Sequence, residues 1–408
     1  MNIRTILFAI SVAVLLAGCK IQFAALDGGE IYAQTEGFVC SEFRKCTANV
    51  VDTSFNESFL ARPKEGYAFD GWVNGTDYFC GGKRGSCDLS TTGFEGNTAL
   101  LDVIDSDKEF YLVARFKPEC YTGESELGGM YREPLRLCRE GSPYTVTADI
   151  QLGPEAPFFV DPGVTLASTS PTGNTLVSYS NVYLLGKPQK KVRIRDINIA
   201  TNYSGQTSTI DINHTIMTFP RTKELSTPSL DMVFTEAGGY ARITDSEIHA
   251  GVFFNADSNS RVISTVTTGK APIVATRIER NTFVDGGLLL LVDKDIFIRN
   301  NLWLGESTEI IIRRAGASKV VANYNSFLAT TPQLGGISLG GQWTNSVIVE
   351  PRSTGQNIDL KSNFWGTTNR TKIADEIWDA NDTFEVDVTA SFRPILGKPH
   401  PKTPTTSG

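Results

Sequence analysis

A six-residue pattern of apolar and polar positions recurs along the second half of the chain. It reads aliphatic, two variable residues, asparagine (serine in the first copy), one variable residue, and a large apolar residue. Its five copies begin at Ile243, Ile278, Ile298, Ala322 and Leu360, which puts their starts 35, 20, 24 and 38 residues apart. One coil of a stacked-strand repeat takes about 20–25 residues, so the longer gaps fit coils with protruding loops or a skipped coil. The segment from Ile194 to Ile199 is a weaker match, with Ile197 in the asparagine position.

The pattern predicts two columns of stacked side chains. The first and sixth positions are expected to point inward, and the sixth gives an apolar column of Ile248, Phe283, Trp303, Phe327 and Trp365. The fourth position gives a structural ladder of Ser246, Asn281, Asn301, Asn325 and Asn363. Asparagine tolerates a left-handed backbone and hydrogen-bonds to a neighbouring asparagine and to backbone amides, so each is expected at a bend. The alternative is a β-sandwich in which these asparagine–aromatic pairs arise by chance.

Segments at both ends of the repeat resemble one class of bacterial proteins. Pro162-Gly163-Val164-Thr165-Leu166 resembles the first coil of right-handed parallel β-helices, and Asn363-Phe364-Trp365-Gly366-Thr367-Thr368 resembles the closing segment of pectate-lyase-like members. The resemblance implies a right-handed parallel β-helix over residues 145–395, closed by a short helix and a turn at Asp379-Ala380-Asn381-Asp382. We interpret Asp379 and Asp382 as a cap and not as catalytic carboxylates. Residues 396–408 are rich in proline and threonine and are predicted to be disordered.

Short β-type runs separated by glycine and asparagine fill residues 21 to about 117. Pro63, the segment Gly66-Tyr67-Ala68-Phe69-Asp70-Gly71-Trp72, the Cys80–Cys87 interval and Val113-Ala114-Arg115-Phe116 resemble the InlB B-repeat domains of bacterial surface proteins. The resemblance implies a β-grasp-like spacer or adhesive module over residues 19–118, with an unusual insert from Thr91 to Asp105. Its aromatic residues are read as core and not as a sugar-stacking platform. Asp102, Asp105 and Asp107 are read as a solvated loop and not as a calcium site.

The first twenty residues have the pattern of an export signal. An apolar run from Ile6 to Leu16 is too short to cross a bilayer but suits a signal-peptide core. It ends in Leu15-Leu16-Ala17-Gly18-Cys19, which resembles a bacterial lipobox and implies removal of residues 1–18 and lipidation of Cys19. Lys20 implies sorting to the outer membrane if the source is a Gram-negative bacterium. An ordinary secretory signal with a chance cysteine is the alternative.

Six further cysteines remain, and an exported protein is expected to pair them. Their spacing favours the local disulfides Cys40–Cys46, Cys80–Cys87 and Cys120–Cys138, and the last would close a linker over residues 119–144. The rival interpretations are metal ligation and a catalytic thiol. Both are disfavoured, because the chain has no C-x-x-C pair and no histidine near these cysteines.

Composition narrows the classes of partner. The chain has 408 residues and a net charge of −7, which argues against a nucleic-acid partner. Its three histidines, His214, His249 and His400, are far apart, so neither a metal nor another cofactor is expected. The expected partners are the membrane, through the lipid anchor, and a polysaccharide or a surface protein.

Two functional hypotheses follow. The first is a surface-anchored lipoprotein whose β-helix binds glycan or a partner protein, or builds envelope structure, with no catalytic residue. The second is a polysaccharide lyase or hydrolase acting on acidic polysaccharide, with the candidate bases Arg280, Arg299, Arg313, Arg314 and Lys361. The motif set of a polygalacturonase-like hydrolase is missing, which favours the first. A basic residue with two or more carboxylates within about 6 Å in an open groove would favour the second.

Overall fold

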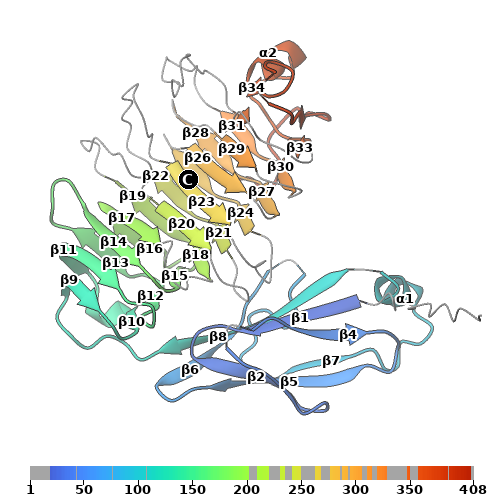
Figure 1. Cartoon of the computed structure of the whole chain (residues 1–408), viewed down its shortest axis with the longest axis vertical. Helices are drawn as coiled ribbons and strands as arrows, with labels where there is room; N and C mark the ends of the chain where they lie inside the picture. Colours follow the sequence, from blue (N-terminus) through green and yellow to red (C-terminus); the bar gives the residue numbers. More distant parts are fainter. Residues whose placement is uncertain are drawn as a thin grey trace, which may run out of the picture.

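The computed structural model describes residues 19–405 except for short intervals. The intervals left out are 43, 76, 107, 202–208, 220–229, 235–240, 250–261, 268–275, 285–286, 293–294, 306–309, 315–318, 329–346, 350–356 and 385. The described chain is all-β, with long parallel sheets and three disulfides. No helix within these residues is both long and apolar enough to cross a bilayer. Figure 1 shows a blue first module beside a long stack of strands that runs from green to red.

The first module, residues 19–118, consists of two four-stranded sheets around one core. One sheet has the order β4-β1-β8-β6 and the other β3-β2-β5-β7. Their strands are β1 (Cys19–Ala25), β2 (Gly29–Ala33), β3 (Phe38–Cys40), β4 (Cys46–Val50), β5 (Asn56–Pro63), β6 (Tyr67–Trp72), β7 (Cys87–Ser90) and β8 (Glu109–Pro118). Trp72 and Phe116 are buried, and Tyr67 and Phe69 pack against them, as expected for core aromatics.

Disulfides brace this module where its core is small. Cys40–Cys46 ties β3 of one sheet to β4 of the other, and Cys80–Cys87 closes the loop that leads into β7. The predicted local pairings are therefore formed. The insert from Thr91 to Asp105 is not only a loop, because it contains helix α1 (Thr98–Ile104), capped by the Asn97 side chain, which accepts the Leu100 N–H at 3.0 Å. Asp107 lies outside the described residues.

The second domain is built from parallel strands that pair with a strand about three positions away along the chain. Its ten-stranded sheet has the order β10 (Leu135–Leu137), β12 (Phe158–Val160), β15 (Val182–Leu185), β18 (Ile210–Asn213), β21 (Ala241–Thr244), β24 (Thr276–Glu279), β27 (Ile296–Arg299), β30 (Val320–Asn323), β33 (Ile358–Asp359) and β35 (Ala390–Ser391). All its pairings are parallel.

Two further parallel ladders accompany this sheet, and β11 (Tyr144–Leu152) joins them because its halves pair with β13 and β14. One ladder contains β13 (Thr165–Ser168), β16 (Val192–Arg195), β19 (Thr215–Thr218), β22 (Glu247–His249), β25 (Thr282–Val284), β28 (Leu302–Leu304) and β31 (Ser326–Leu328). The other contains β9 (Glu126–Tyr131), β14 (Asn174–Ser178), β17 (Ile197–Thr201), β20 (Leu230–Phe234), β23 (Val262–Thr267), β26 (Gly287–Val292), β29 (Ile310–Arg314), β32 (Val347–Val349) and β34 (Ile377–Trp378).

The boundaries of this domain differ from the prediction at both ends. Residues 119–144 are not a linker, because β9 pairs with β11 and β10 with β12, with a short 3-10 turn (Arg139–Gly141) after them. Residues 396–405 are not disordered: Thr403 is buried, and its hydroxyl donates to the Tyr324 carbonyl at 2.7 Å. Helix α2 (Arg370–Asp375) follows the Trp-Gly-Thr segment, as the resemblance implies.

The polar ladder forms a continuous chain of hydrogen bonds. The Asn281 backbone N–H donates to Asn301 Oδ1 at 2.9 Å, and the Asn301 N–H to Asn325 Oδ1 at 3.0 Å. The Asn325 N–H continues to Asn363 Oδ1 at 2.8 Å, and the Ser246 N–H donates to Asn281 Oδ1 at 3.0 Å. Each asparagine Nδ2 donates to a carbonyl of the preceding repeat copy, as Asn301 does to Ile278 at 2.8 Å. These bonds satisfy backbone groups that a buried bend would otherwise leave unpaired.

The left-handed residue of each bend is the third position and not the fourth. Asp245, Arg280, Asn300, Tyr324 and Ser362 have φ between 53° and 61°, whereas none of the ladder residues has positive φ. The left-handed residue of the bend is therefore one position earlier than predicted. The ladder side chain belongs to the residue that directly follows it. The weak match from Ile194 to Ile199 belongs to a different bend, between β16 and β17, where Asp196 has φ 56°.

A sixth ladder member precedes the five predicted from sequence. The Thr215 N–H donates to Ser246 Oγ at 3.0 Å, and Met217 is the register partner of Ile248 in the apolar column. The column itself stacks as expected: ring centroids are 4.2 Å apart for Phe283–Trp303 and 4.5 Å for Phe327–Trp365. Threonine and methionine replace asparagine and an aromatic residue in this copy of the pattern, so the sequence did not mark it.

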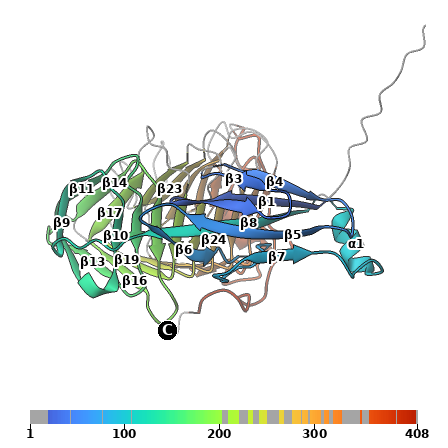
Figure 2. The same cartoon turned by 90° about the horizontal axis from the view of Figure 1, so that it is seen from below.

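The first module is held against the second domain by a small apolar core and a buried carboxyl. Leu26, Val73 and Val113 pack on Phe159 and Tyr183, whose rings stack at 4.4 Å. Asp27 is buried beside them, and its Oδ2 accepts the Tyr183 hydroxyl and the Asn181 amide, both at 2.7 Å. Burial raises the pKa of Asp27 to about 6. The hydrogen bonds from Tyr183 and Asn181 lower this pKa, and the charge of Glu42 raises it further. Figure 1 shows the module beside the green and yellow strands of the second domain, and Figure 2 shows it in front of them in the view from below.

Removing one ladder side chain should destabilise the fold. Asn301→Ala deletes the acceptor of the Asn281 N–H and the donor to the Ile278 carbonyl. Leaving buried backbone groups unpaired should lower the free energy of unfolding by about 1–3 kcal/mol. Asn323→Ala is the control, because Asn323 is only half-buried and accepts from Arg299 Nε at 3.3 Å. Equal denaturation midpoints for the two variants would contradict the ladder.

The raised pKa of Asp27 should make stability fall as the pH rises. The native state holds this proton up to about pH 6, whereas the unfolded chain releases it near the usual pKa of 3.8. The free energy of unfolding should therefore drop between about pH 4 and 6, by roughly 3 kcal/mol for a shift of this size. Asp27→Asn should remove this part of the slope. Identical pH dependence of denaturation for the natural chain and the variant would show that the carboxyl is not buried in this way.

Candidate functional site

A charged cleft lies where the first module meets the ten-stranded sheet. Its volume is about 1080 Å³, and both parts of the chain line it. The first module contributes Asp70, Arg84, Arg115 and Lys117; the second domain contributes Arg136, Asp161, Lys187, Arg242, Asp245, Arg277, Glu279 and Arg280. Eight of these twelve side chains are basic and four are acidic, so the cleft is cationic in a chain whose net charge is −7. A concave surface of one sign concentrates ligands of the opposite sign.

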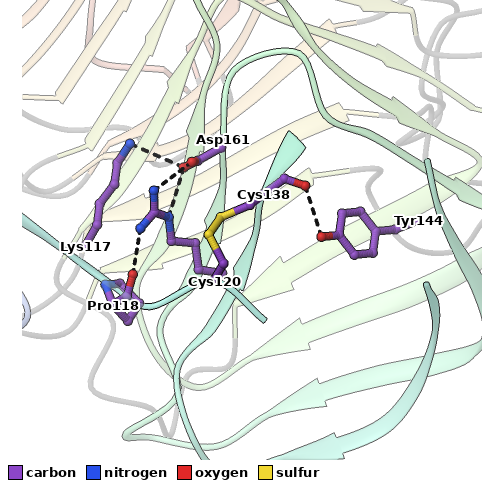
Figure 3. Close-up of a disulfide and its surroundings, with 7 residues drawn as sticks. Lys117, Pro118, Cys120, Cys138, Tyr144 and Asp161 are labelled. Atoms are coloured by element: carbon purple, nitrogen blue, oxygen red, sulfur yellow. Dashed lines mark hydrogen bonds and ion pairs between the residues drawn. A yellow bond between two sulfur atoms is a disulfide. The ribbon is translucent and has the colours of Figure 1, made fainter. Parts of the chain in front are cut away.

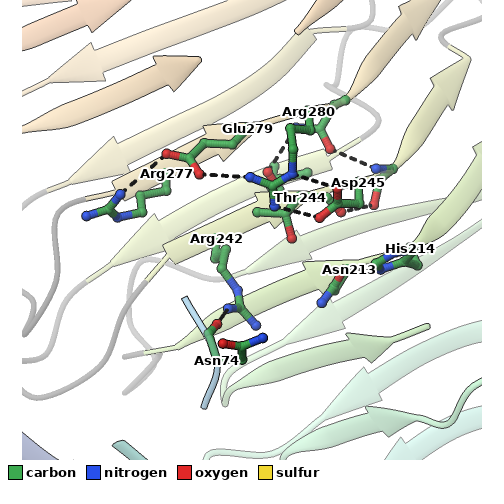
Figure 4. A network of polar contacts seen from close by, with 12 residues as sticks. Asn74, Asn213, His214, Arg242, Thr244, Asp245, Arg277, Glu279 and Arg280 are labelled. Carbon is green, nitrogen blue, oxygen red and sulfur yellow. Dashed lines mark hydrogen bonds and ion pairs between the residues drawn. The ribbon is translucent and has the colours of Figure 1, made fainter. Parts of the chain in front are cut away.

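A column of register partners on adjacent strands runs beneath the cleft, and Arg242 and Arg277 of this column line it. Tyr183, Asp211, Arg242 and Arg277 are successive register partners on β15, β18, β21 and β24. The buried Asp211 carboxylate accepts Arg242 Nε at 3.0 Å and Nη2 at 2.8 Å, and Arg115 Nη1 lies 3.6 Å away. Arg242 Nη1 also donates to the Asn74 carbonyl at 2.6 Å, so this arginine connects the two parts of the chain (Figure 4).

The wall of the cleft carries a network around Arg280. Its Nε and Nη2 each lie 2.7 Å from an oxygen of Asp245, and its Nη1 lies 3.3 Å from Glu279 (Figure 4). Glu279 also receives Arg277 Nη1 at 3.4 Å. The hydrogen bond with Asp245 raises the pKa of Arg280 above its ordinary value, against the effect of burial. The guanidinium therefore stays protonated and is not suited to abstract a proton.

His214 is the one histidine that lines this cleft. It sits at the bend after β18, next to Asn213, whose Oδ1 is 2.5 Å from His214 Nδ1. Burial lowers the pKa of His214 below its ordinary value, against the charge of Asp245, so the imidazole is neutral at neutral pH. His249 instead contacts Glu247 at 2.5 Å, and the His400 ring packs 4.7 Å from Tyr324.

The segment that connects the two parts is held in place at the edge of the cleft. Arg136 Nη2 lies 2.8 Å from Asp161, Lys117 Nζ lies 3.3 Å from it, and Arg136 Nη1 donates to the Pro118 carbonyl at 2.8 Å. The Cys120–Cys138 disulfide closes the same segment (Figure 3). Burial lowers the pKa of Lys117, whereas the pKa of Asp161 is lowered because its partners outweigh its burial.

The candidate bases from the sequence are not brought together. Arg280 lines the cleft, Arg299 lies on the next strand beside it, and Lys361 is exposed on a later coil. Arg313 and Arg314 end β29, but their side chains are outside the description. Glu279 and Arg299 are register partners, yet Glu279 is bound by Arg277 and Arg280, and Arg299 donates to Asn323.

Two other sequence predictions concern single positions. Asp379 has the features of a cap: it is buried, and its carboxylate accepts the N–H of Asn381 at 2.8 Å and of Ala390 at 2.6 Å. Cys19 opens β1, and residues 1–18 lie outside the described chain, so lipidation stays a prediction.

No protein-family model, curated protein or solved structure matches this chain. Among the described residues, no group of three or more His, Cys, Asp or Glu side chains is arranged to hold a metal ion.

Proposed function

We propose that this chain is a surface-anchored lipoprotein that binds an acidic glycan in the cleft between its two parts. The observation that carries the proposal is the excess of basic side chains in that cleft, in a chain that is acidic overall. Carboxylate-bearing polymers are matched by such a surface because arginine and lysine donate charge-assisted hydrogen bonds to carboxylates. A concave site suits an extended polymer better than the broad, flatter surface of a protein partner.

The architecture that we propose is the one implied by the resemblance. The first module would be an InlB B-repeat-like domain, and residues from β9 to β35 would wind as a right-handed parallel β-helix. The pairing of strands about three positions apart and the ladder of asparagines support the winding. The module is packed against the parallel sheet, so it would shape the binding site and not serve only as a spacer.

The proposed activity is binding without turnover. The basic residue with two carboxylates that would favour a lyase is present, since Arg280 contacts Asp245 and Glu279. Its raised pKa argues against a role as a base. The Asp–Asp pair with histidine that a hydrolase needs is also missing from the sequence motifs.

A polysaccharide lyase is the second candidate, and His214 is the observation that favours it. Its imidazole is neutral at neutral pH and lies in the same cleft as Arg280. A neutral imidazole can remove a proton next to a uronate carboxylate, while arginines neutralise the developing negative charge.

The binding proposal predicts that the affinity for an acidic oligosaccharide depends on the charge of Lys187. Among the described ion pairs Lys187 has no carboxylate partner, so Lys187→Gln removes a cleft charge without exposing an unpaired acid. With the mature chain carrying Cys19→Ala, calorimetric titration should show binding of oligogalacturonate but not of a neutral oligoglucan of equal length. Lys187→Gln should weaken the affinity about tenfold, since a charge-assisted hydrogen bond contributes about 1.5 kcal/mol.

Lys361→Gln is the matched control, because Lys361 is an exposed lysine that does not line the cleft. The Lys361→Gln variant should bind oligogalacturonate with the same affinity as the natural chain. Added salt should weaken binding to both proteins. Equal effects of the two lysine variants, or equal binding of the neutral oligomer, would contradict the proposal. Steady formation of unsaturated uronate that is lost in His214→Gln would establish the lyase instead.

A further inference from the structure

Strand β1 begins at the cysteine that we propose carries the lipid. Cys19 is the first residue of β1 and is the register partner of Val50 on β4. The N–H of Lys20 donates to the Lys108 carbonyl at 3.1 Å, and Lys20 is paired with both Asn49 and Glu109. No flexible residues therefore separate the acylation site from the folded module, and a lipid on Cys19 would hold this end of the module at the bilayer.

Two exposed apolar side chains lie at this same end. Val51 directly follows the partner of Cys19 and is 47% exposed, and Phe94 is 53% exposed. The Thr91 hydroxyl donates to the Asp52 carbonyl at 3.2 Å, and its N–H donates to the Phe55 carbonyl at 2.8 Å. These bonds hold the loop bearing Phe94 next to the segment that follows Val51. In both views of the molecule, α1, which follows this loop, lies at the end where β1 begins (Figures 1 and 2).

We propose that Val51 and Phe94 insert into the interfacial layer of the bilayer and fix the orientation of the lipoprotein on the membrane. The inference rests on the proposed lipidation of Cys19. Adjacent strands are about 4.8 Å apart, so the acyl chains would enter the bilayer beside Val51. A single phenylalanine adds little affinity of its own, but an acyl anchor already supplies the binding, and each apolar side chain that leaves water then adds to it.

Acidic neighbours define the kind of bilayer that this end fits. Asp52 accepts the Ser54 hydroxyl and N–H, and Glu95 accepts the Gly93 N–H at 2.9 Å. These bonds lower the pKa of both carboxyls, so both are ionised at neutral pH. An anionic surface would repel them, and a surface of zwitterionic lipid would not.

The orientation has a consequence for the cleft. The first module is packed on the second domain through Phe159 and Tyr183, so fixing the module also fixes the cleft relative to the membrane plane. The second domain would be held beside the bilayer at a set angle and would not swing on a tether.

The experiment places an environment-sensitive label at Phe94. The acylated lipoprotein carrying Phe94→Cys is labelled with a nitrobenzoxadiazole dye and reconstituted into phosphatidylcholine vesicles. Met130→Cys is the control, since Met130 is 58% exposed on β9, at the opposite end of the molecule from α1. Both labelled chains must keep the three disulfides and the melting temperature of the natural chain.

Dithionite in the outer buffer should reduce the dye at residue 94 several-fold more slowly than the dye at residue 130, and only the first should shift its emission to the blue. Equal reduction rates on vesicle-bound protein would overturn the proposed insertion while leaving the anchor intact. Sedimentation of Cys19→Ala with the vesicles to the same extent as the natural lipoprotein would overturn the anchor itself.

Discussion

The contact between Asp27 and the second domain is the interaction on which the other features depend. Its buried carboxyl accepts hydrogen bonds from Tyr183 and Asn181, next to the stacked rings of Phe159 and Tyr183. Burying a carboxyl is costly unless its partners are in place, so this contact specifies one way for the two parts to meet. The cleft exists only in that arrangement, because its lining comes from both parts.

The same arrangement explains why the cleft is cationic although the chain is acidic. Asp211 is buried under Arg242 and Arg115, and Asp161 is held by Arg136 and Lys117. These acids orient the basic side chains around them and leave more basic groups than acidic ones toward the opening. Oriented cations need little rearrangement to meet an anionic ligand, which favours binding.

Sequence reasoning succeeded where the determining contacts are local or periodic. The three disulfides join cysteines close in sequence, and Asn281, Asn301 and Asn325 recur at the interval of one coil. It failed at Thr215, where a threonine takes the ladder position that the pattern assigns to asparagine. It also failed in residues 119–144, whose strands do not carry the repeat pattern. The cleft could not be predicted, because Arg115 and Arg242 are far apart in sequence and no local motif marks their meeting with Asp211.

The central claim is that the two parts form one body with a fixed cleft between them. Pulsed electron paramagnetic resonance between spin labels at Val51→Cys and Phe384→Cys tests it most directly, because both positions are exposed and lie on different parts. A single narrow distance distribution, unchanged between pH 5 and pH 7.5 and on adding ligand, is predicted for the locked arrangement. A broad distribution, or two distances whose populations change with pH, would show that the parts move independently and that the cleft is not a preformed site.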